Sequence, residues 1–272
     1  MALNYLDWLW HGALRRPYPL HVTFDRAYGN QYTVVFLHGI GASGAVWEEV
    51  AGQLNGEPVR VIAFDLLGFG QSPKPVIKYN ADEQARAVIK AMSRHKVRKP
   101  VMLVGHSMGS LIAARIARIR PDLVQHLILY QMPVYEGLPE RGGYRLRRDF
   151  YFKLYDAIVD DPTMLLGSSM RAVVLRKAGV SVTPETLQPF ARSLRHTIME
   201  QSVLSDLSHI KVPIDVIYGS LDVLVIRGKA ETVFTEVPAP LRTHTITQLH
   251  RLTPRASKFI AKRITAAAVA TR

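Results

Sequence analysis

The sequence predicts an α/β protein, in which a mostly parallel sheet is flanked by helices and interrupted by a helical insertion. Short apolar segments alternate with helical segments along most of the chain, as they do in α/β folds. Most of the apolar segments are continuously hydrophobic, which is typical of parallel strands covered on both faces. The length of 272 residues suits one large domain with an insertion better than two equal domains.

Each element is predicted from its residue types. Apolar, β-branched and aromatic residues mark strands at 20–24 and 33–37, with a Gly29-Asn30 turn between them. The next elements are a helix at 46–54, a strand at 59–64, a helix at 81–95, a strand at 101–104, an alanine-rich helix at 110–117 and a strand at 127–130. The alternation then stops, and it resumes with strands at 214–218 and 241–247 and a basic C-terminal helix. We therefore predict a core over residues 1–131 and 213–272, and a helical cap over residues 132–212.

The pattern G-x-S-x-G at residues 105–109 lies between a predicted strand and the alanine-rich helix. A sharp strand-to-helix turn strains the serine backbone, and side chains two residues before or after it would clash, so glycines are needed there. Such a turn raises the serine hydroxyl above the end of the sheet. The sequence therefore predicts that Ser107 is a catalytic nucleophile.

A serine nucleophile needs an adjacent base, and the base needs an acid that orients it. Asp222 and His250 each follow one of the last two predicted strands. The chain order Ser107, Asp222, His250 is the order expected for a hydrolase with this serine turn. His244 and Asp215 are weaker candidates for base and acid, because both lie inside predicted strands.

A serine hydrolase also needs donors for the oxyanion that forms in the transition state. The backbone N–H of Met108, directly after the nucleophile, is the first expected donor. The second is expected from the loop at residues 38–41, most simply the Ile40 N–H, because glycines on either side allow close approach to a substrate.

Together these motifs resemble the α/β-hydrolase superfamily, in its esterase-like branch with a helical cap. The resemblance rests on residues 36–39 (F-L-H-G), 65–72 (D-L-L-G-F-G-Q-S), 105–109 (G-H-S-M-G), 219–222 (G-S-L-D) and His250. It implies an eight-stranded, mostly parallel sheet, no metal ion or organic cofactor, and a cap over the active site. It also implies that Asp65 and Ser72 belong to a structural loop rather than to the triad. Many relatives carry glycine before the catalytic histidine, where this chain has Leu249.

The nucleophile narrows the expected reaction. Relatives that cleave haloalkanes or epoxides carry aspartate where this chain has Ser107. We therefore expect a carboxylesterase-like serine hydrolase, acting through an acyl-enzyme on a small-to-medium carboxylic ester. Carbon–carbon bond hydrolysis or perhydrolysis by the same triad is the alternative. The sequence does not identify the small-molecule acyl substrate. The cap aromatics Tyr135, Tyr144, Phe150, Tyr151 and Phe190 either pack within the cap or line an acyl pocket.

Two interpretations from other classes stay open. Residues 39–44 match G-x-G-x-x-G, which is the pattern of an NAD(P)-binding oxidoreductase. His38 and Trp47 are unusual in that motif, and no tyrosine is followed four residues later by lysine. A non-catalytic ligand-binding protein on a hydrolase fold is the second interpretation, because a fold does not fix a function.

The composition indicates in which compartment the protein is expected and which classes of partner it is expected to bind. The chain has no cysteine, which excludes disulfides and thiolate chemistry, and no signal peptide or membrane span is recognisable, so we expect a cytoplasmic protein. The net charge is +13, but aromatic residues do not interleave with the basic segments, so nucleic acid is not expected. Weak contact with an anionic membrane is a further expectation, through the basic C-terminal helix (Arg255, Lys258 and Lys262) and an N-terminal apolar stripe (Leu3, Leu6, Trp10 and Leu14).

Overall fold

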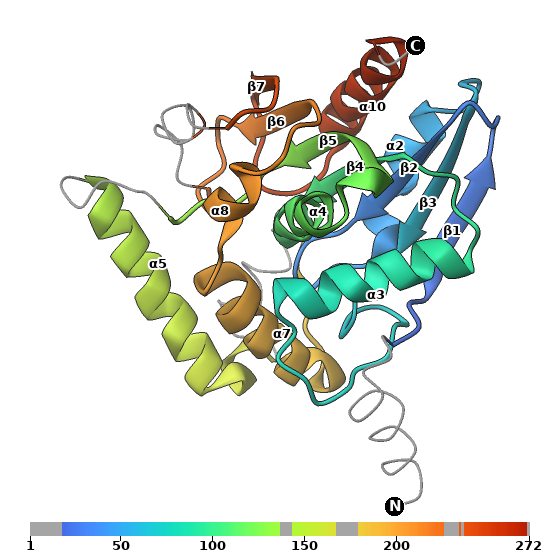
Figure 1. Ribbon diagram of the computed structural model, residues 1–272. Helices are drawn as coiled ribbons and strands as arrows, with labels where there is room; N and C mark the ends of the chain where they lie inside the picture. The colour runs from blue at the N-terminus through green and yellow to red at the C-terminus, as the bar shows by residue number, and fades with distance from the viewer. Residues whose placement is uncertain (1–17, 137–142, 167–178, 226–233, 235–236, 271–272) are drawn as a thin grey trace, which may run out of the picture.

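A seven-stranded sheet, in the order β1-β3-β2-β4-β5-β6-β7, forms the centre of the computed structural model (Figure 1). The structure describes residues 18–136, 143–166, 179–225, 234 and 237–270. The strands are β1 (Val22–Ala27), β2 (Tyr32–Leu37), β3 (Val59–Phe64), β4 (Val101–His106), β5 (Val124–Tyr130), β6 (Ile214–Gly219) and β7 (Leu241–Ile246). All neighbouring pairs are parallel except β1 and β3. The described residues thus form seven strands, where the family resemblance implied eight and the element-by-element prediction gave seven.

The first two strands are joined by a turn, but they are not neighbours in the sheet. β1 pairs with β3, so that Phe24 lies opposite Ala63, while β2 occupies an interior position between β3 and β4. Every residue of β2 is buried, whereas β1 has exposed and half-buried residues. An interior strand needs apolar residues on both faces, and β1 carries polar residues that only an edge position tolerates.

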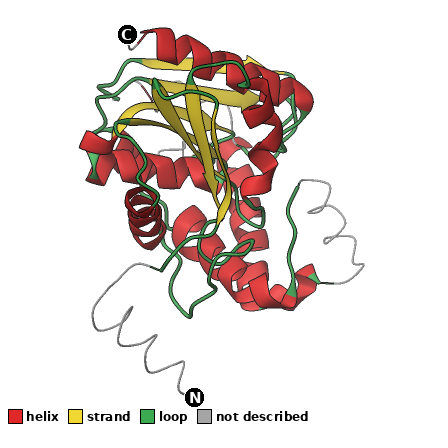
Figure 2. Cartoon of the chain, turned by 90° about the vertical axis from the view of Figure 1, so that its right-hand side faces the viewer, coloured by secondary structure: helices red, strands yellow, loops and turns green. Residues whose placement is uncertain are grey.

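Helices cover both faces of the sheet (Figure 2). On one face, α3 (Ala81–Arg94) and α4 (Met108–Ile119) pack against each other and on the strands. On the other face, α2 (Glu48–Gln53) packs against α10 (Pro254–Ala270), and the 3-10 turn η2 (Gly44–Trp47) precedes α2. No helix among the described residues is long and apolar enough to cross a membrane.

Between β5 and β6, the described residues form helices and helical turns joined by loops, with no strand among them. The elements of this segment are α5 (Gly143–Asp160), η4 (Pro162–Leu165), η5 (Pro184–Thr186), α7 (Leu187–Ser193), the π-helical turn η6 (Leu194–Met199) and α8 (Val203–Leu207). A short turn, η3 (Pro121–Leu123), precedes β5. In Figure 1, α5 and α7 lie below and to the left of the sheet, with α7 beside the start of α3. This is the segment in which the sequence predicts a cap.

A buried cluster of charged and imidazole groups joins the last strands to the C-terminal helix. Asp215 on β6 accepts hydrogen bonds from His126 on β5 (2.7 Å) and His244 on β7 (2.6 Å), and from Arg263 on α10 (3.0 Å). Burial by itself would raise the pKa of Asp215, but the two histidine hydrogen bonds and the positive Arg263 together lower it to about 2. The two residues that were weaker triad candidates, Asp215 and His244, thus bind each other in a structural cluster.

We expect Asp215→Ala to lower the free energy of unfolding by about 3 kcal/mol at neutral pH, because it leaves the half-buried Arg263 and the buried His126 without their shared partner. Since the folded-state pKa of Asp215 is lowered, its contribution is complete above about pH 4 and is lost as the pH falls towards 2. Urea unfolding, monitored by circular dichroism, should show that the difference in unfolding free energy between wild type and variant disappears over that pH range.

The matched control is Asp25→Ala, which removes the partner of Arg60 at the sheet edge. Because the Asp25 carboxylate is about one-third exposed, we expect a loss of less than about 1 kcal/mol. Two results would contradict the account of this cluster. One is an equal loss of unfolding free energy from the two substitutions. The other is a difference in unfolding free energy between wild type and Asp215→Ala that stays constant down to about pH 2.

Candidate active site

Ser107 occupies a sharp turn between β4 and α4. Its backbone has φ 52° and ψ −119°, a left-handed φ that is strained for any residue with a side chain. A Cβ on Gly105 would collide with the backbone of Gly109, and one on Gly109 would collide with the carbonyl oxygen of Leu37. These close approaches explain both glycines of the motif. The turn leaves Ser107 5% exposed at the carboxyl end of β4.

The loops after β6 and β7 bring Asp222 and His250 together. The Nδ1 atom of His250 lies 2.7 Å from Oδ2 of Asp222, and the other carboxylate oxygen accepts the backbone N–H of Leu224 at 2.8 Å. The Asp222 carboxylate is fully buried, and the His250 side chain is 11% exposed. Because a carboxylate can only accept, Nδ1 of His250 carries a proton, and in the neutral imidazole the lone pair is then on Nε2.

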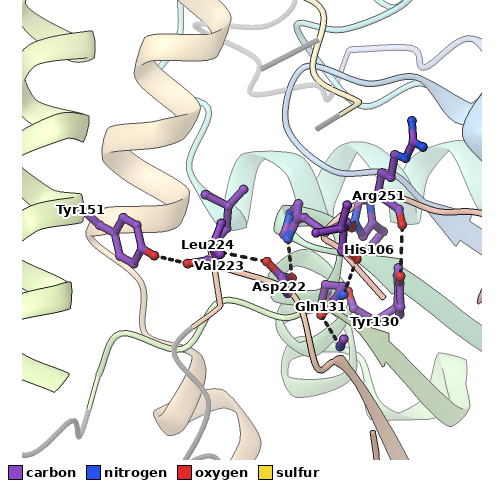
Figure 3. A network of polar contacts seen from close by, with 12 residues as sticks. His106, Tyr130, Gln131, Tyr151, Asp222, Val223, Leu224 and Arg251 are labelled. Atoms are coloured by element: carbon purple, nitrogen blue, oxygen red, sulfur yellow. Dashed lines mark hydrogen bonds and ion pairs between the residues drawn. The ribbon is translucent and has the colours of Figure 1, made fainter. Parts of the chain in front are cut away.

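Three side chains at the ends of β4 and β5 hold the backbone on either side of His250 (Figure 3). Gln131 donates to the Leu249 carbonyl (2.8 Å), His106 to the His250 carbonyl (2.8 Å) and Tyr130 to the Arg251 carbonyl (3.2 Å). We call His106, Tyr130 and Gln131 the donor cluster. It fixes three successive peptide groups, so the position of the imidazole depends on strands that lie far away in the sequence.

Gln131 also reaches the loop that carries the acid. Its Oε1 accepts the backbone N–H of Gly219 (2.8 Å), while its Nε2 donates to the Leu249 carbonyl. The side chain is fully buried, and a Cβ on Gly219 would collide with it. One amide thus sets the separation between the loop of Asp222 and the loop of His250.

The buried imidazole of His106 is neutral. Burial, together with a smaller effect of the nearby His250, whose ring centroid is 5.1 Å away, lowers its pKa to about 3. Its Nε2 must carry the proton, because it donates to a carbonyl. A neutral His106 adds no positive charge beside His250.

His38 orients the loop that follows β2. Its Nδ1 donates to the Gly39 carbonyl (2.7 Å), and its Nε2 accepts the backbone N–H of Leu66 (2.9 Å), while burial lowers its pKa. In a trans peptide the C=O and N–H point in opposite directions. Holding the Gly39 carbonyl on one side therefore turns the Ile40 N–H to the other. Met108 is the first residue of α4, so its N–H has no partner within the helix.

Asp65 organises the neighbouring loop. Its carboxylate accepts the backbone N–H groups of Gly44 (2.7 Å) and Gln71 (2.8 Å) and the Thr23 hydroxyl (2.8 Å). Burial would raise the pKa of Asp65, but these hydrogen bonds outweigh it and lower the pKa. These three partners belong to core strands or loops. The hydrogen bonds to the Asp65 carboxylate therefore hold the conformation of the loop.

A cavity of about 110 Å³ lies beside Ser107 and His250. Its walls are mostly apolar and come from the loop after β2, from the segment between β5 and β6, and from the loop after β6. They include Gly39, Ile40, Leu154, Ile158, Val180, Phe190, Leu194, Ile198 and Leu224. Two phenols also line it: Tyr135 donates to the Leu224 carbonyl (3.1 Å) and lies 3.0 Å from the Tyr155 hydroxyl. Burial raises the pKa of Tyr155 to about 12, so both groups are neutral hydroxyls at physiological pH.

The structure brings most of the predicted site residues to one place. Ser107, His250 and Ile40 line the cavity, and Asp222 binds His250 from behind. Of the cap aromatics, Tyr135 and Phe190 line the cavity, Tyr151 is buried with its hydroxyl donating to the Val223 carbonyl, and Phe150 is exposed. The Tyr144 side chain lies outside the described residues, as does the N-terminal apolar stripe.

The sequence analysis missed the donor cluster and the orienting role of His38. A signal was present for Gln131, since a polar residue stands directly after a strand that ends at the same sheet edge as the site. The partners of Gln131 are 88 and 118 residues away in the chain, so no local pattern could indicate them. Residues 39–44, the alternative dinucleotide motif, lead into the four-residue turn η2 rather than directly into a long helix.

Relatives of known sequence match somewhat less than half of this chain. The "Probable lysophospholipase BODYGUARD 4" of Arabidopsis thaliana is 33% identical over 134 residues, which are 44% of this chain and 31% of that protein. The 1-acylglycerol-3-phosphate O-acyltransferase of Homo sapiens is 33% identical over 122 residues, which are 43% of this chain and 34% of that protein. The matched segments thus span about a third of the length of these relatives.

Solved structures share the fold over most of the chain. An esterase from Exiguobacterium antarcticum superimposes with a TM-score of 0.70 at 22% identity, covering 92% of this chain and 95% of its own. The enol-lactonase from Burkholderia xenovorans LB400 superimposes with a TM-score of 0.69 at 19% identity, covering 92% of this chain and 96% of its own. A haloalkane dehalogenase from Bradyrhizobium elkani superimposes with a TM-score of 0.68 at 20% identity, covering 92% of this chain and 99% of its own. These neighbours differ in chemistry, so their similarity establishes the fold alone.

The family match rests on the sequence itself. The alpha/beta hydrolase fold family matches residues 32–201, which run from β2 to the segment before α8. That range includes the serine turn and much of the helical segment after β5. The sheet order, the helices on both faces and the loops gathered at the carboxyl edge agree with it. The chain belongs to the alpha/beta hydrolase fold family.

Proposed function

We propose that this chain is a serine hydrolase that cleaves a small-to-medium carboxylic ester through an acyl-enzyme. One observation carries the proposal: the Asp222–His250 pair, with its protonated Nδ1 towards the acid, lies at the cavity that also contains Ser107. A free Nε2 lone pair beside a serine is the arrangement that removes the proton from a hydroxyl nucleophile.

In this proposal, the Oγ atom of Ser107 attacks the acyl carbon while His250 accepts the Oγ proton at Nε2. Asp222 stabilises the imidazolium that results. The N–H groups of Ile40 and Met108 hold the oxyanion, and each such donor typically lowers the barrier by about 3 kcal/mol. His250 then gives the proton to the departing alcohol. A water molecule, activated by the same imidazole, releases the acid and restores Ser107.

The cavity supports a substrate with an apolar acyl group. Apart from Ser107, His250 and the buried Tyr135 and Tyr155 hydroxyls, its walls are largely aliphatic and aromatic carbon. Neighbouring helices supply those walls, since Leu154 and Ile158 come from α5 and Phe190 from α7. We propose that residues 132–212 act as a cap, and that this cap selects the acyl chain.

The first prediction concerns the nucleophile. Ser107→Ala should lower kcat for p-nitrophenyl esters, assayed from acetate to laurate, by at least about a thousandfold, because no other group can form the acyl-enzyme. Ser93→Ala, at an exposed position near the end of α3, is the matched control and should retain wild-type rates. A fluorophosphonate probe should label the wild type and Ser93→Ala, but not Ser107→Ala. Equal turnover by wild type and Ser107→Ala would favour a non-catalytic binding protein.

The second prediction concerns Gln131 as a positioning residue. Gln131→Leu removes the bonds to both the acid loop and the histidine loop, so we expect kcat to fall about 10- to 100-fold with KM changed little. Labelling by the fluorophosphonate should slow in parallel, because the base no longer meets the serine in the productive geometry.

Gln84→Leu is the control for stability. Gln84 is equally buried and its amide also makes two backbone hydrogen bonds, but both go to Leu67. Both variants should lose thermal stability to a similar extent, and only Gln131→Leu should show the large fall in kcat. If the two lose kcat equally for equal losses in Tm, Gln131 has a structural role alone.

A further inference from the structure

Large apolar side chains on the surface gather around the loops that carry Asp222 and His250. The described residues include seven large hydrophobic side chains that are strongly exposed. Five of them are Leu146 and Phe150 on α5, Leu221 and Val223 beside the acid, and Leu249 beside the base. The other two, Val76 and Val269, lie in the loop before α3 and near the end of α10. We call the five the apolar patch.

The patch arises because the two site loops alternate between inward and outward side chains. Asp222 is buried while its neighbours Leu221 and Val223 are 54% and 64% exposed. In the adjacent loop, Leu249 is 52% exposed beside the largely buried His250. The inward side chains form the candidate site, whereas the outward ones leave large apolar groups exposed to solvent.

Contacts join the parts of the patch. The Leu221 N–H donates to the Gln248 carbonyl at 3.0 Å, which places Leu221 next to the loop of Leu249. The Val223 carbonyl accepts a hydrogen bond from Tyr151 on α5 (Figure 3). It also accepts one from Arg147 on the same helix. The Phe150 ring lies 5.8 Å from that of Tyr151 and one helical turn beyond Leu146.

The charges beside the patch are mostly positive. Arg145, Arg147 and Arg148 lie on the same turns of α5 as Leu146 and Phe150, against the single acid Asp149. Arg251 is exposed two residues after Leu249. The whole chain carries a net charge of +13, so a second copy of it would be repelled, whereas an anionic surface would be attracted.

We propose that the apolar patch docks on an anionic lipid surface. Exposed apolar groups bordered by arginines are what membrane-interface binding requires, since the apolar groups enter the acyl boundary and the cations meet the headgroups. Docking there would bring the Asp222 and His250 loops against the lipid. The contact surface differs from the exposed basic face of α10 (Arg255, Lys258 and Lys262), for which the sequence analysis expects at most a weak membrane contact.

The proposal extends the proposed function, because a lipid surface would supply acyl esters, but its test is independent of catalysis. The probe is co-sedimentation with vesicles of equal parts phosphatidylglycerol and phosphatidylcholine, using the full chain with Ser107→Ala so that no lipid is consumed. We expect binding that weakens as sodium chloride is raised, since surface charges are screened by salt. Vesicles of phosphatidylcholine alone should bind more weakly.

The decisive variant is Phe150→Gln/Leu221→Gln/Val223→Gln in the Ser107→Ala chain, which should bind the vesicles at least tenfold more weakly. Val76→Gln/Val269→Gln is the matched control, with apolar groups of similar exposure elsewhere, and should bind like its parent. A circular dichroism spectrum and a melting temperature like those of the parent chain would confirm that the fold of the triple variant is intact.

Three results would overturn the proposal: no binding to the anionic vesicles by the parent chain, equal binding by the triple variant and its parent, or equal losses in the triple and control variants. A fourth contrary result would come from light scattering. If the parent chain is a dimer and the triple variant is a monomer, the patch is a contact between copies of the chain. If Ser107→Ala also left ester hydrolysis unchanged, the proposed function would fail while the vesicle result stood by itself.

Discussion

Hydrogen bonds from the donor cluster to the loop of His250 are the interactions on which the site depends. His106, Tyr130 and Gln131 stand at the ends of two central strands whose side chains are almost entirely buried. These strands cannot shift without disturbing the core, so donors anchored on them give the histidine loop a fixed reference. Gln131 extends the same reference to the acid loop through Gly219. The acid and the base therefore keep one geometry although short loops carry both of them.

The helices after β5 add a second support, from the opposite side of the acid. Tyr151 on α5 donates to the Val223 carbonyl, and Tyr135 donates to the Leu224 carbonyl. The backbone N–H of the same Leu224 donates to the Asp222 carboxylate. Burial keeps the Tyr135 hydroxyl neutral and able to donate. The segment that walls the cavity thus also holds the loop of Asp222, so the shape of the cavity and the position of Asp222 are linked through the same side chains.

Two aspartate–histidine pairs in this fold show how surroundings decide what such a pair can do. Asp215 is enclosed by His126, His244 and Arg263, and both carboxylate oxygens are occupied by these partners. Asp222 binds one imidazole and one backbone N–H, and the imidazole faces a cavity. The first pair joins strands to a helix. The second leaves one imidazole nitrogen available, which is what acid–base chemistry needs.

The sequence by itself determined the α/β class, the order of the elements and the serine turn, because each depends on residues close together in the chain: apolar runs for the strands, and two glycines around Ser107 for the turn. It also indicated Asp222 and His250, since residues directly after parallel strands meet at one sheet edge. Tertiary structure alone decided that β1 pairs with β3, that Gln131 joins the acid and histidine loops, and that Leu221, Val223 and Leu249 face outwards. Those outcomes depend on which distant segments meet in space, and a local pattern carries no record of that.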